Sequence, residues 1–474
     1  MWKPVVFGVV AILATPLLVL WGAVGWVLTR PPLAAATTSV AAVLALAIAA
    51  YVDDATMLFD VPAVLAVVLG LFMTLPKKTL YDWPLLIAFL SFAIARRVCL
   101  PTPPTSLPNW ITVISCVGLI WGYTTTRKLW VSANLETLTV IEDRLYKAHI
   151  MAEYTMLKVG GLGTVHVPYC GEKRDESRLP PLNLVLVHGY AAGNAFWATN
   201  LQTLAKHYNV YAVEWLGIGR SDRPDPKFAS YDEADAFFVD AIERWRKEMQ
   251  LDQFVLAGHS MGGIFVTHYA VKYPERVEQL VLISPAGVGY PPKDASEPRS
   301  YFFRIVRMGW RAEMTPMAIV RYLGPFGPKL VSWILQRRMS WLPDTSVLKS
   351  GILDPALIAD YMYHNWALKK SGDVAMNTHL LPGAFGKRAL RDDLLPGQIK
   401  MPVTFLYGGG SDWMDYNHGQ DVVDRLKTTQ YASLRKVPLA GHQVFMDNAA
   451  AFNTMLIDAI TDGLELRSFR TEAY

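Results

Sequence analysis

The residues best suited to chemistry lie in a short glycine-bounded motif, Gly258-His259-Ser260-Met261-Gly262. The motif follows an apolar run, Phe254–Ala257, and precedes a helix-like stretch that starts near Gly263. Its glycines permit a tight strand-to-helix turn that holds the Ser260 hydroxyl above a sheet as a nucleophile. The backbone N–H of Met261, at the start of the helix, can donate to an oxyanion. The motif therefore predicts nucleophilic catalysis by a serine.

A polar loop further along the chain contains the candidate acids of a catalytic triad. It follows the apolar run Val403–Tyr407 and includes both Asp412 and Asp415. Three glycines at 408–410 allow the close turn that would aim a carboxylate at an imidazole. The order serine, aspartate, histidine along the chain is the order expected when the serine lies in a turn of this kind. Spacing alone leaves the choice between Asp412 and Asp415 open.

His442 is the candidate base, because it lies on a loop after the strand-like run Leu434–Val437. In the expected mechanism it accepts the proton of Ser260 while that oxygen attacks an ester carbonyl, and the acid stabilises the imidazolium. His442 also begins an H-x-x-x-x-D pattern that ends at Asp447. Such a pair would activate an acceptor hydroxyl in an acyltransferase. Aspartate is also a favoured N-cap residue, and we expect Asp447 to cap the helix that begins near Asn448.

The elements that must position these residues are predicted to form a parallel sheet. Five continuous apolar runs are bounded by turn residues: Leu184–Val187, Val210–Val213, Phe254–Ala257, Leu280–Ile283 and Val403–Tyr407. They are separated by helix-length segments such as Asp235–Met249, which is typical of strands buried on both faces of a parallel sheet. The fold class is therefore α/β. In the loop after the first run, the backbone N–H of Tyr190 is expected to complete an oxyanion hole with that of Met261.

The first 123 residues have a different composition. Pro4–Thr29 and Leu33–Val52 are apolar runs without a lysine, arginine or glutamate inside them, and each can cross a hydrocarbon layer ~30 Å thick. We expect an all-α membrane region of about three to five hydrophobic segments over residues 1–123, because shorter apolar runs follow the first two. A connector over 124–150 would lead into a hydrolase domain over 151–474. Arg127 and Lys128 favour the cytosolic side for that domain.

Composition excludes several classes of protein. Of 474 residues, 52% are hydrophobic and only 18% are charged, which excludes an intrinsically disordered chain. The formal charge of +4 comes from the first 130 residues, and the remainder is neutral, so we expect no nucleic-acid partner. The ten histidines form no metal-binding motif, and no cofactor fingerprint occurs, so we expect neither a metal nor a cofactor.

Together the motifs resemble the α/β-hydrolase superfamily. Within it they resemble the branch of lysophospholipid and N-acylphosphatidylethanolamine lipases, the cardiolipin-specific phospholipase and the lipid-droplet lipase coactivator. The matching stretches are Val187–Gly193, Glu214–Pro224, Gly258–Gly263, Lys272–Val277, Ser284–Val288, Tyr407–Asp415 and Gly441–Asp447. The resemblance implies an α/β-hydrolase fold, with helices on both faces of the sheet and a helical cap at about residues 286–400. It assigns Ser260 as nucleophile, His442 as base and Asp412 or Asp415 as acid.

We therefore expect an integral membrane serine hydrolase that cleaves an acyl ester of a phospholipid, a lysophospholipid or a related glycerolipid. Its partners would be the lipid substrate and the bilayer. Basic and aromatic residues are interleaved between Arg299 and Pro343, as they would be in a cap that docks on a membrane. An ordinary helical lid with a solvated basic face would have the same pattern. A lysophosphatidic acid acyltransferase that uses the pair His442 and Asp447 is an alternative, and a non-catalytic lipase regulator or scaffold is another. The oligomeric state and the organelle stay open.

Overall fold

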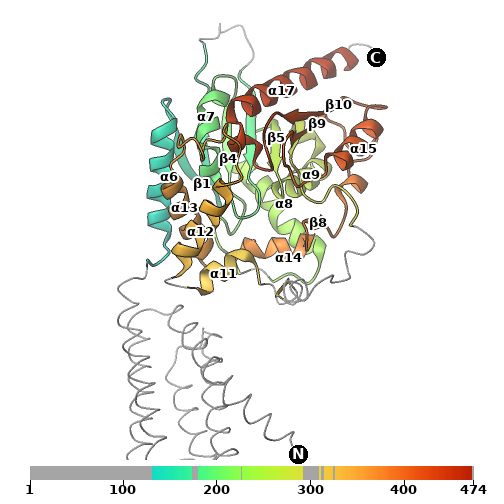
Figure 1. The fold of residues 1–474 in the computed structure, drawn as a ribbon. Helices are drawn as coiled ribbons and strands as arrows, with labels where there is room; N and C mark the ends of the chain where they lie inside the picture. The colour runs from blue at the N-terminus through green and yellow to red at the C-terminus, as the bar shows by residue number, and fades with distance from the viewer. Residues whose placement is uncertain are drawn as a thin grey trace, which may run out of the picture. The chain divides into compact units, whose positions relative to one another are not determined.

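The computed structural model describes residues 131–172, 180–225, 227–291, 309–310, 314–323 and 326–471, with side chains up to residue 465 (Figure 1). The expected membrane region over residues 1–123 lies outside the described residues, as does the first part of the connector. Among the helices that are described, none combines the length and the apolar character needed to cross a membrane. Residues 133–321 and 328–474 form one compact unit, which contains the motifs described above.

An eight-stranded sheet forms the centre of this unit, in the order β1-β2-β4-β3-β5-β6-β9-β10. The strands are β1 Thr155–Val159, β2 Leu162–Val167, β3 Asn183–Val187, β4 Asn209–Val213, β5 Phe254–His259, β6 Val277–Ile283, β9 Val403–Gly408 and β10 Ala432–Val437. The strands from β4 to β10 pair in parallel, and β2 pairs antiparallel with both β1 and β4. All five strands expected from apolar runs are present. Their parallel direction brings the loops after β3, β5, β9 and β10 to one edge of the sheet.

Helices cover both faces of the sheet (Figure 1). They are α7 Ala198–Ala205, α8 Tyr231–Glu248, α9 Gly262–Lys272, α15 Tyr416–Leu426 and α17 Ala449–Thr471. The connection through α7 runs from β3 to β4, whereas those through α8, α9 and α15 run in the opposite direction along the sheet. Because such crossovers are right-handed, α7 lies on one face and the other three lie on the opposite face. Helix α17 contacts α7 and therefore shares its face.

A helical insertion separates β6 from β9. It contains α11 Pro316–Tyr322, α12 Gly327–Met339, α13 Pro355–Ala367 and α14 Ala375–His379. A two-stranded sheet, β7 Leu380–Leu381 with β8 Phe385–Gly386, follows α14. Helix α6, Leu135–His149, precedes the sheet in the chain and packs against α13. The insertion occupies the stretch where a cap is expected.

The hairpin of β1 and β2 was not expected from the sequence. Its strands are joined at Gly160 and Gly161, whose φ angles are 58° and 83°. Only glycine adopts such angles without strain, so this pair permits the tight reversal. Strand β1 is only partly buried and carries no continuous apolar run, which is why its sequence gives a weak signal. The hairpin extends the parallel sheet by two antiparallel strands at its edge.

Candidate active site

Ser260 occupies the turn between β5 and α9. Its φ angle is 52°, a left-handed conformation that is strained for a residue with a side chain. Its backbone N–H donates to the carbonyl oxygen of Ile283, 2.9 Å away, which ties the turn to β6. A Cβ atom added at Gly262 would lie 2.4 Å from the carbonyl oxygen of His188, and one at Gly258 would lie 2.8 Å from that of Gly262. The two glycines of the motif are therefore required by close backbone packing, as expected for a nucleophile elbow.

His442 lies between the side chains of Ser260 and Asp412. Its Nε2 atom is 3.0 Å from Oγ of Ser260, and its Nδ1 atom is 3.2 Å from Oδ1 of Asp412. The loop after β10 brings the histidine to the edge of the sheet where β5 and β9 also end. The indole ring of Trp413 meets the imidazole edge-to-face, with ring centroids 4.7 Å apart. Three residues from loops far apart in the sequence thus form one continuous hydrogen-bonded chain.

Asp412 is held by four donors. Its Oδ2 atom accepts from Oγ of Ser284 (2.6 Å) and from the backbone N–H of Gly408 (3.0 Å). Its Oδ1 atom accepts from the backbone N–H of Met414 (3.0 Å) and faces His442. Burial raises the pKa of Asp412, but the hydrogen bonds and the nearby imidazole outweigh burial and hold it below its usual range. The carboxylate is therefore negatively charged at neutral pH and fixed in orientation.

Asp415, the other candidate acid, lies apart from His442. It is exposed and precedes α15, where its Oδ1 atom accepts from the backbone N–H of Asn417 at 2.9 Å. Its Oδ2 atom is 3.9 Å from Nε2 of His418, one turn into the same helix. This is the geometry of a helix N-cap. The structure therefore brings Asp412, and not Asp415, to the imidazole of His442.

The loop after β3 passes directly over Ser260. A Cβ atom added at Gly189 would lie 2.9 Å from Cβ of Ser260 and 2.7 Å from Nδ1 of His259. Glycine is needed there for this close approach. The backbone N–H groups of Tyr190 and Met261 donate no hydrogen bond to any residue in the described part of the chain. Both groups are therefore available to a ligand atom beside the serine.

Asp447 does not cap the next helix, and the expectation that it does is wrong. Asn448 takes that position, since its side chain accepts from the backbone N–H of Ala451 at 3.3 Å. Asp447 is buried instead, and its Oδ2 atom accepts from the backbone N–H of Gly441 at 3.0 Å. The chain folds back at residues 441–447, so that this N–H, which lacks a strand partner, reaches the carboxylate. Burial raises the pKa of Asp447 above its usual value.

Two buried histidines beside the site were not assigned chemistry from the sequence. Nε2 of His259 lies 3.0 Å from the backbone oxygen of His442, so it can donate to that oxygen and hold the loop. Nδ1 of His188 accepts from the indole N–H of Trp215 at 2.9 Å. Burial lowers the pKa of His188 to about 3, so this ring is neutral. In the sequence, only the position of His188 two residues before Tyr190 indicates that His188 shapes the loop after β3.

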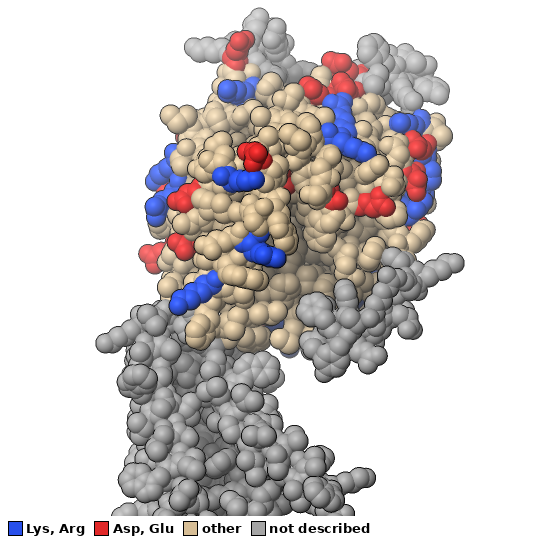
Figure 2. All heavy atoms as spheres, viewed as in Figure 1, with Lys and Arg blue, Asp and Glu red and all other residues tan. Residues whose placement is uncertain are grey.

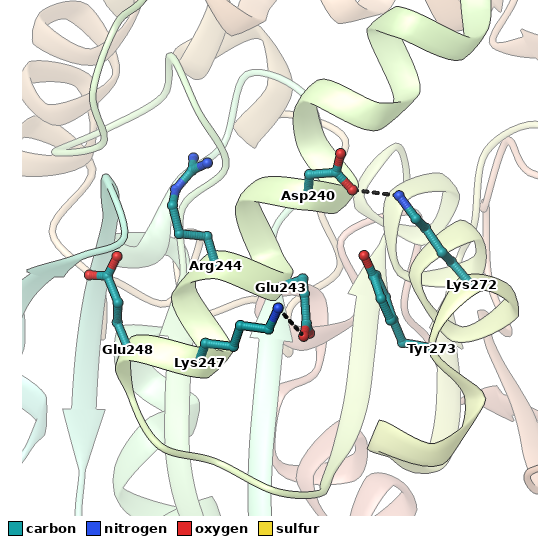
Figure 3. A pocket seen from close by; sticks show the side chains of 7 residues that line it. All are labelled: Asp240, Glu243, Arg244, Lys247, Glu248, Lys272 and Tyr273. Carbon is teal, nitrogen blue, oxygen red and sulfur yellow. Dashed lines mark hydrogen bonds and ion pairs between the residues drawn. The ribbon is translucent and has the colours of Figure 1, made fainter.

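The surface of the unit carries charges of both signs. Figure 2 shows Lys and Arg side chains interspersed with Asp and Glu, and a hollow near the middle of this face. A separate depression of about 500 Å³ lies over α8 and the end of α9 (Figure 3). Four of its charged side chains pair with one another, Lys272 with Asp240 and Lys247 with Glu243. Its other two, Arg244 and Glu248, bond the backbone of Gly160. Because all six side chains have partners, we assign no chemistry to this depression. Over the described ranges, no group of three or more His, Cys, Asp or Glu residues could hold a metal ion.

The sequence of this chain matches a known protein family. The model of the α/β hydrolase fold family matches residues 183–449, which is more than half of the chain. The chain belongs to the α/β-hydrolase fold family. The resemblance drawn from the motifs is confirmed, including its branch, by curated relatives of this α/β hydrolase.

Three of these relatives have lipid-related names. A rice protein named probable 1-acylglycerol-3-phosphate O-acyltransferase is 36% identical over 58% of this chain and 66% of its own length. The bovine (lyso)-N-acylphosphatidylethanolamine lipase is 31% identical over 60% of this chain and 80% of its own length. The rat 1-acylglycerol-3-phosphate O-acyltransferase ABHD5 is 33% identical over 57% of this chain and 74% of its own length. The chain thus spans just under two thirds of the rice protein.

Proposed function

We propose that this α/β hydrolase is a serine hydrolase that cleaves an acyl ester of a phospholipid, a lysophospholipid or a related glycerolipid. The observation that carries the proposal is the chain of contacts from Ser260 through His442 to Asp412, with distances of 3.0 and 3.2 Å. Separations of this size suit proton transfer between a nucleophile, a base and an orienting acid. The lipid-related names of the relatives support a lipid as the substrate.

In the proposed mechanism, Nε2 of His442 accepts the proton of Ser260 as Oγ attacks the ester carbonyl carbon. The oxyanion of the tetrahedral intermediate accepts from the backbone N–H groups of Met261 and Tyr190. When the C–O bond of the ester breaks, His442 gives its proton to the departing alcohol oxygen, and the acyl group stays on Ser260. Water then attacks this acyl-enzyme, again with His442 as base, and releases the fatty acid. Asp412 stabilises the imidazolium in both steps.

A membrane location forms part of this proposal. The apolar runs Pro4–Thr29 and Leu33–Val52 would anchor the chain, and Arg127 and Lys128 favour the cytosol for the hydrolase unit. The bilayer would then supply the lipid directly. The exposed rings of Trp333 and Trp341 would suit contact with headgroups.

An acyltransferase is the second candidate. In that reaction the hydroxyl of a lysophospholipid, and not water, would attack the acyl group. The acyltransferase name of the rice relative favours this reading, together with the buried carboxyl of Asp447 next to the loop of His442. Against it, the two ring nitrogens of His442 contact Ser260 and Asp412, and among the described residues no hydrogen bond or ion pair joins Asp447 to the ring.

Product analysis separates these readings. The full chain, in its membrane, would be given labelled lysophospholipid with and without acyl-CoA, beside the variants Ser260→Ala and Ser350→Ala. We expect labelled free fatty acid from the native chain and from the exposed-serine control Ser350→Ala. Ser260→Ala should lower the rate by at least about 10³-fold. Diacyl product that depends on acyl-CoA would instead support the transferase. A folded chain that forms neither product and whose Ser260 does not react with a fluorophosphonate would support a regulator.

A further inference from the structure

A cap helix is bonded directly to the loop that carries one of the candidate oxyanion donors. The indole N–H of Trp366, in the last turn of α13, donates to the carbonyl oxygen of Ala191 at 2.7 Å. The side-chain amide of Asn365 donates to the carbonyl oxygen of Ala192 at 2.8 Å. Among the described residues, neither carbonyl oxygen accepts from another donor. The carbonyl groups of the two residues that follow Tyr190 are therefore held by the cap.

Ala191 has a conformation that needs such support. Its φ angle is 58°, in the left-handed region that is strained for a residue with a Cβ atom. A residue stays in that region only when its surroundings hold it there, and the bond from Trp366 fixes the peptide group that follows Ala191. If Ala191 relaxed to a negative φ, the chain on its two sides would turn, and the backbone N–H of Tyr190 would lose its place beside Ser260.

Helix α13 is itself fixed by contacts that do not involve this loop. The backbone N–H of Asn134, which caps α6, donates to Nδ1 of His364 at 3.2 Å, and α6 packs against α13 (Figure 1). Nε and Nη2 of Arg321, in α11, donate to the carbonyl oxygens of Leu368 at 2.6 Å and Trp366 at 3.2 Å. These bonds hold the C-terminal end of α13, so Trp366 is a fixed support for the loop.

The contact continues earlier in α13, at Tyr361. Its hydroxyl donates to Oε1 of Glu214 at 3.1 Å, and the same oxygen accepts from the backbone N–H of Asn194 at 3.3 Å. A Cβ atom added at Gly193 would lie 2.0 Å from the hydroxyl oxygen of Tyr361, so glycine is needed for this close approach. Helix α13 thus contacts three successive residues of the loop, 191–193.

We propose that Trp366 is a positioning residue: it holds Ala191 in its left-handed conformation and so keeps the backbone N–H of Tyr190 aimed at the oxyanion. Asn365 supports the next peptide group in the same way. This inference rests on the proposed serine hydrolase function, and it gives the cap a part in building the catalytic site. Because the oxyanion exists only after Ser260 has attacked, loss of Trp366 should lower kcat and spare KM.

Kinetics of the full chain on a small aryl ester test this separation. Trp366→Phe keeps an aromatic ring and removes the indole N–H. We expect it to lower kcat by about 10- to 100-fold, less than the loss of an oxyanion donor itself, and to change KM by less than about twofold. The control Trp245→Phe, in α8, removes an indole N–H that donates to Oγ1 of Thr164 at 2.9 Å, and it should leave kcat unchanged. An unchanged kcat in Trp366→Phe would overturn the proposal.

A transition-state analogue gives a readout that a purely structural role would not move. With an alkyl trifluoromethyl ketone, Oγ of Ser260 bonds to the ketone carbon, His442 takes the serine proton, and the carbonyl π electrons move to the oxygen, which becomes the oxyanion. Trp366→Phe should weaken this inhibitor in proportion to kcat. The alcohol of the same chain length forms no adduct and should bind as before. Equal weakening of both ligands would show that Trp366 only supports the fold, which would overturn the proposal.

A rescue variant and an exchange measurement complete the test. Glycine adopts a φ of 58° without strain, so Ala191→Gly should restore part of kcat in the Trp366→Phe chain, and no recovery would count against the proposal. Amide hydrogen exchange over residues 189–193 should be faster in Trp366→Phe than in Trp245→Phe, and equal exchange would overturn the proposal. If the native chain neither cleaved the ester nor formed the ketone adduct, the hydrolase function would fail, while exchange still decided whether Trp366 holds the loop.

Discussion

At the scale of single residues, the choice between two aspartates three positions apart depends on where their loop turns. Gly408 closes β9, and its backbone N–H donates to Asp412, so the carboxylate folds back toward the sheet and faces His442. By residue 415 the chain has turned away to begin α15, and Asp415 caps that helix. Ser284, which also has a positive φ angle of 40°, supplies the remaining side-chain donor to Asp412.

This arrangement predicts different effects for the two aspartates. Asp412→Ala should lower kcat on a small aryl ester by about 10⁴-fold, as loss of a triad acid does in serine hydrolases. Asp415→Ala should leave kcat unchanged and lower the free energy of unfolding by about 1 kcal/mol through loss of a helix cap. Steady-state kinetics and chemical unfolding of both variants would check this. A large loss of kcat in Asp415→Ala alone would reverse the assignment.

At the scale of elements, α9 begins two residues after the nucleophile and is held further along by a cluster of histidines and aspartates. Nδ1 of His268, in α9, contacts Oδ1 of Asp235 in α8 at 2.5 Å, and its Nε2 atom is 3.4 Å from Asp393. Nε2 of His379, in α14, is 3.6 Å from the same atom of Asp235. Burial lowers the pKa of His268, but the two carboxylates outweigh it and raise the pKa to about 9. The cluster thus joins the helix of the nucleophile to α8 and to a cap helix.

The raised pKa of His268 predicts a pH-dependent stability. Because the folded pKa is about 9 and the ordinary value is 6.5, the stabilising charge is fully present below pH 6.5 and is lost as pH rises toward 9. The loss should amount to at most about 3 kcal/mol over that range. His268→Gln should abolish this slope in chemical unfolding measured from pH 6 to 9.5. The matched variant at the exposed His207, His207→Gln, should retain it, and an unchanged slope in His268→Gln would contradict the prediction.

At the scale of the whole molecule, α6 is part of the hydrolase unit, although it lies within the expected connector. Oε2 of Glu142, in α6, is 2.6 Å from Nε of Arg220, and both side chains are buried. The other nitrogens of Arg220 donate to the carbonyl oxygens of Leu157 and Thr164, in β1 and β2, at 2.9 Å. One buried ion pair therefore links α6, the hairpin and the loop after β4. The expected boundary between residues 150 and 151 stays a prediction.

Breaking this link should destabilise the unit as a whole. Glu142→Ala leaves Arg220 buried without its carboxylate, which should lower the free energy of unfolding by about 3–5 kcal/mol. Glu136→Ala, at an exposed position of the same helix, should change it by no more than about 0.5 kcal/mol. Urea unfolding of both variants in the full chain, followed by tryptophan fluorescence, gives the comparison. Equal stability of the two variants would show that α6 contributes little to the fold.

Local patterns in the sequence determined much of this protein. Continuous apolar runs predicted five parallel strands, because strands buried on both faces need unbroken apolar sequence. The glycines around Ser260 predicted the sharp turn, because few other residues tolerate such close backbone packing. The order serine, aspartate, histidine along the chain then indicated which loops carry the acid and the base. Each of these features depends on residues that are neighbours in the chain, so the sequence alone predicts it.

Only the tertiary structure decided the contacts between distant segments. It brought Asp412 rather than Asp415 to His442, buried Asp447 against Gly441 and placed Ser284 behind the acid. Each of these depends on how loops separated by tens to hundreds of residues pack together, and on the hydrogen bonds that buried polar groups must then make. No spacing along the chain encodes that packing, and for this reason the choice of the acid emerges only from the fold.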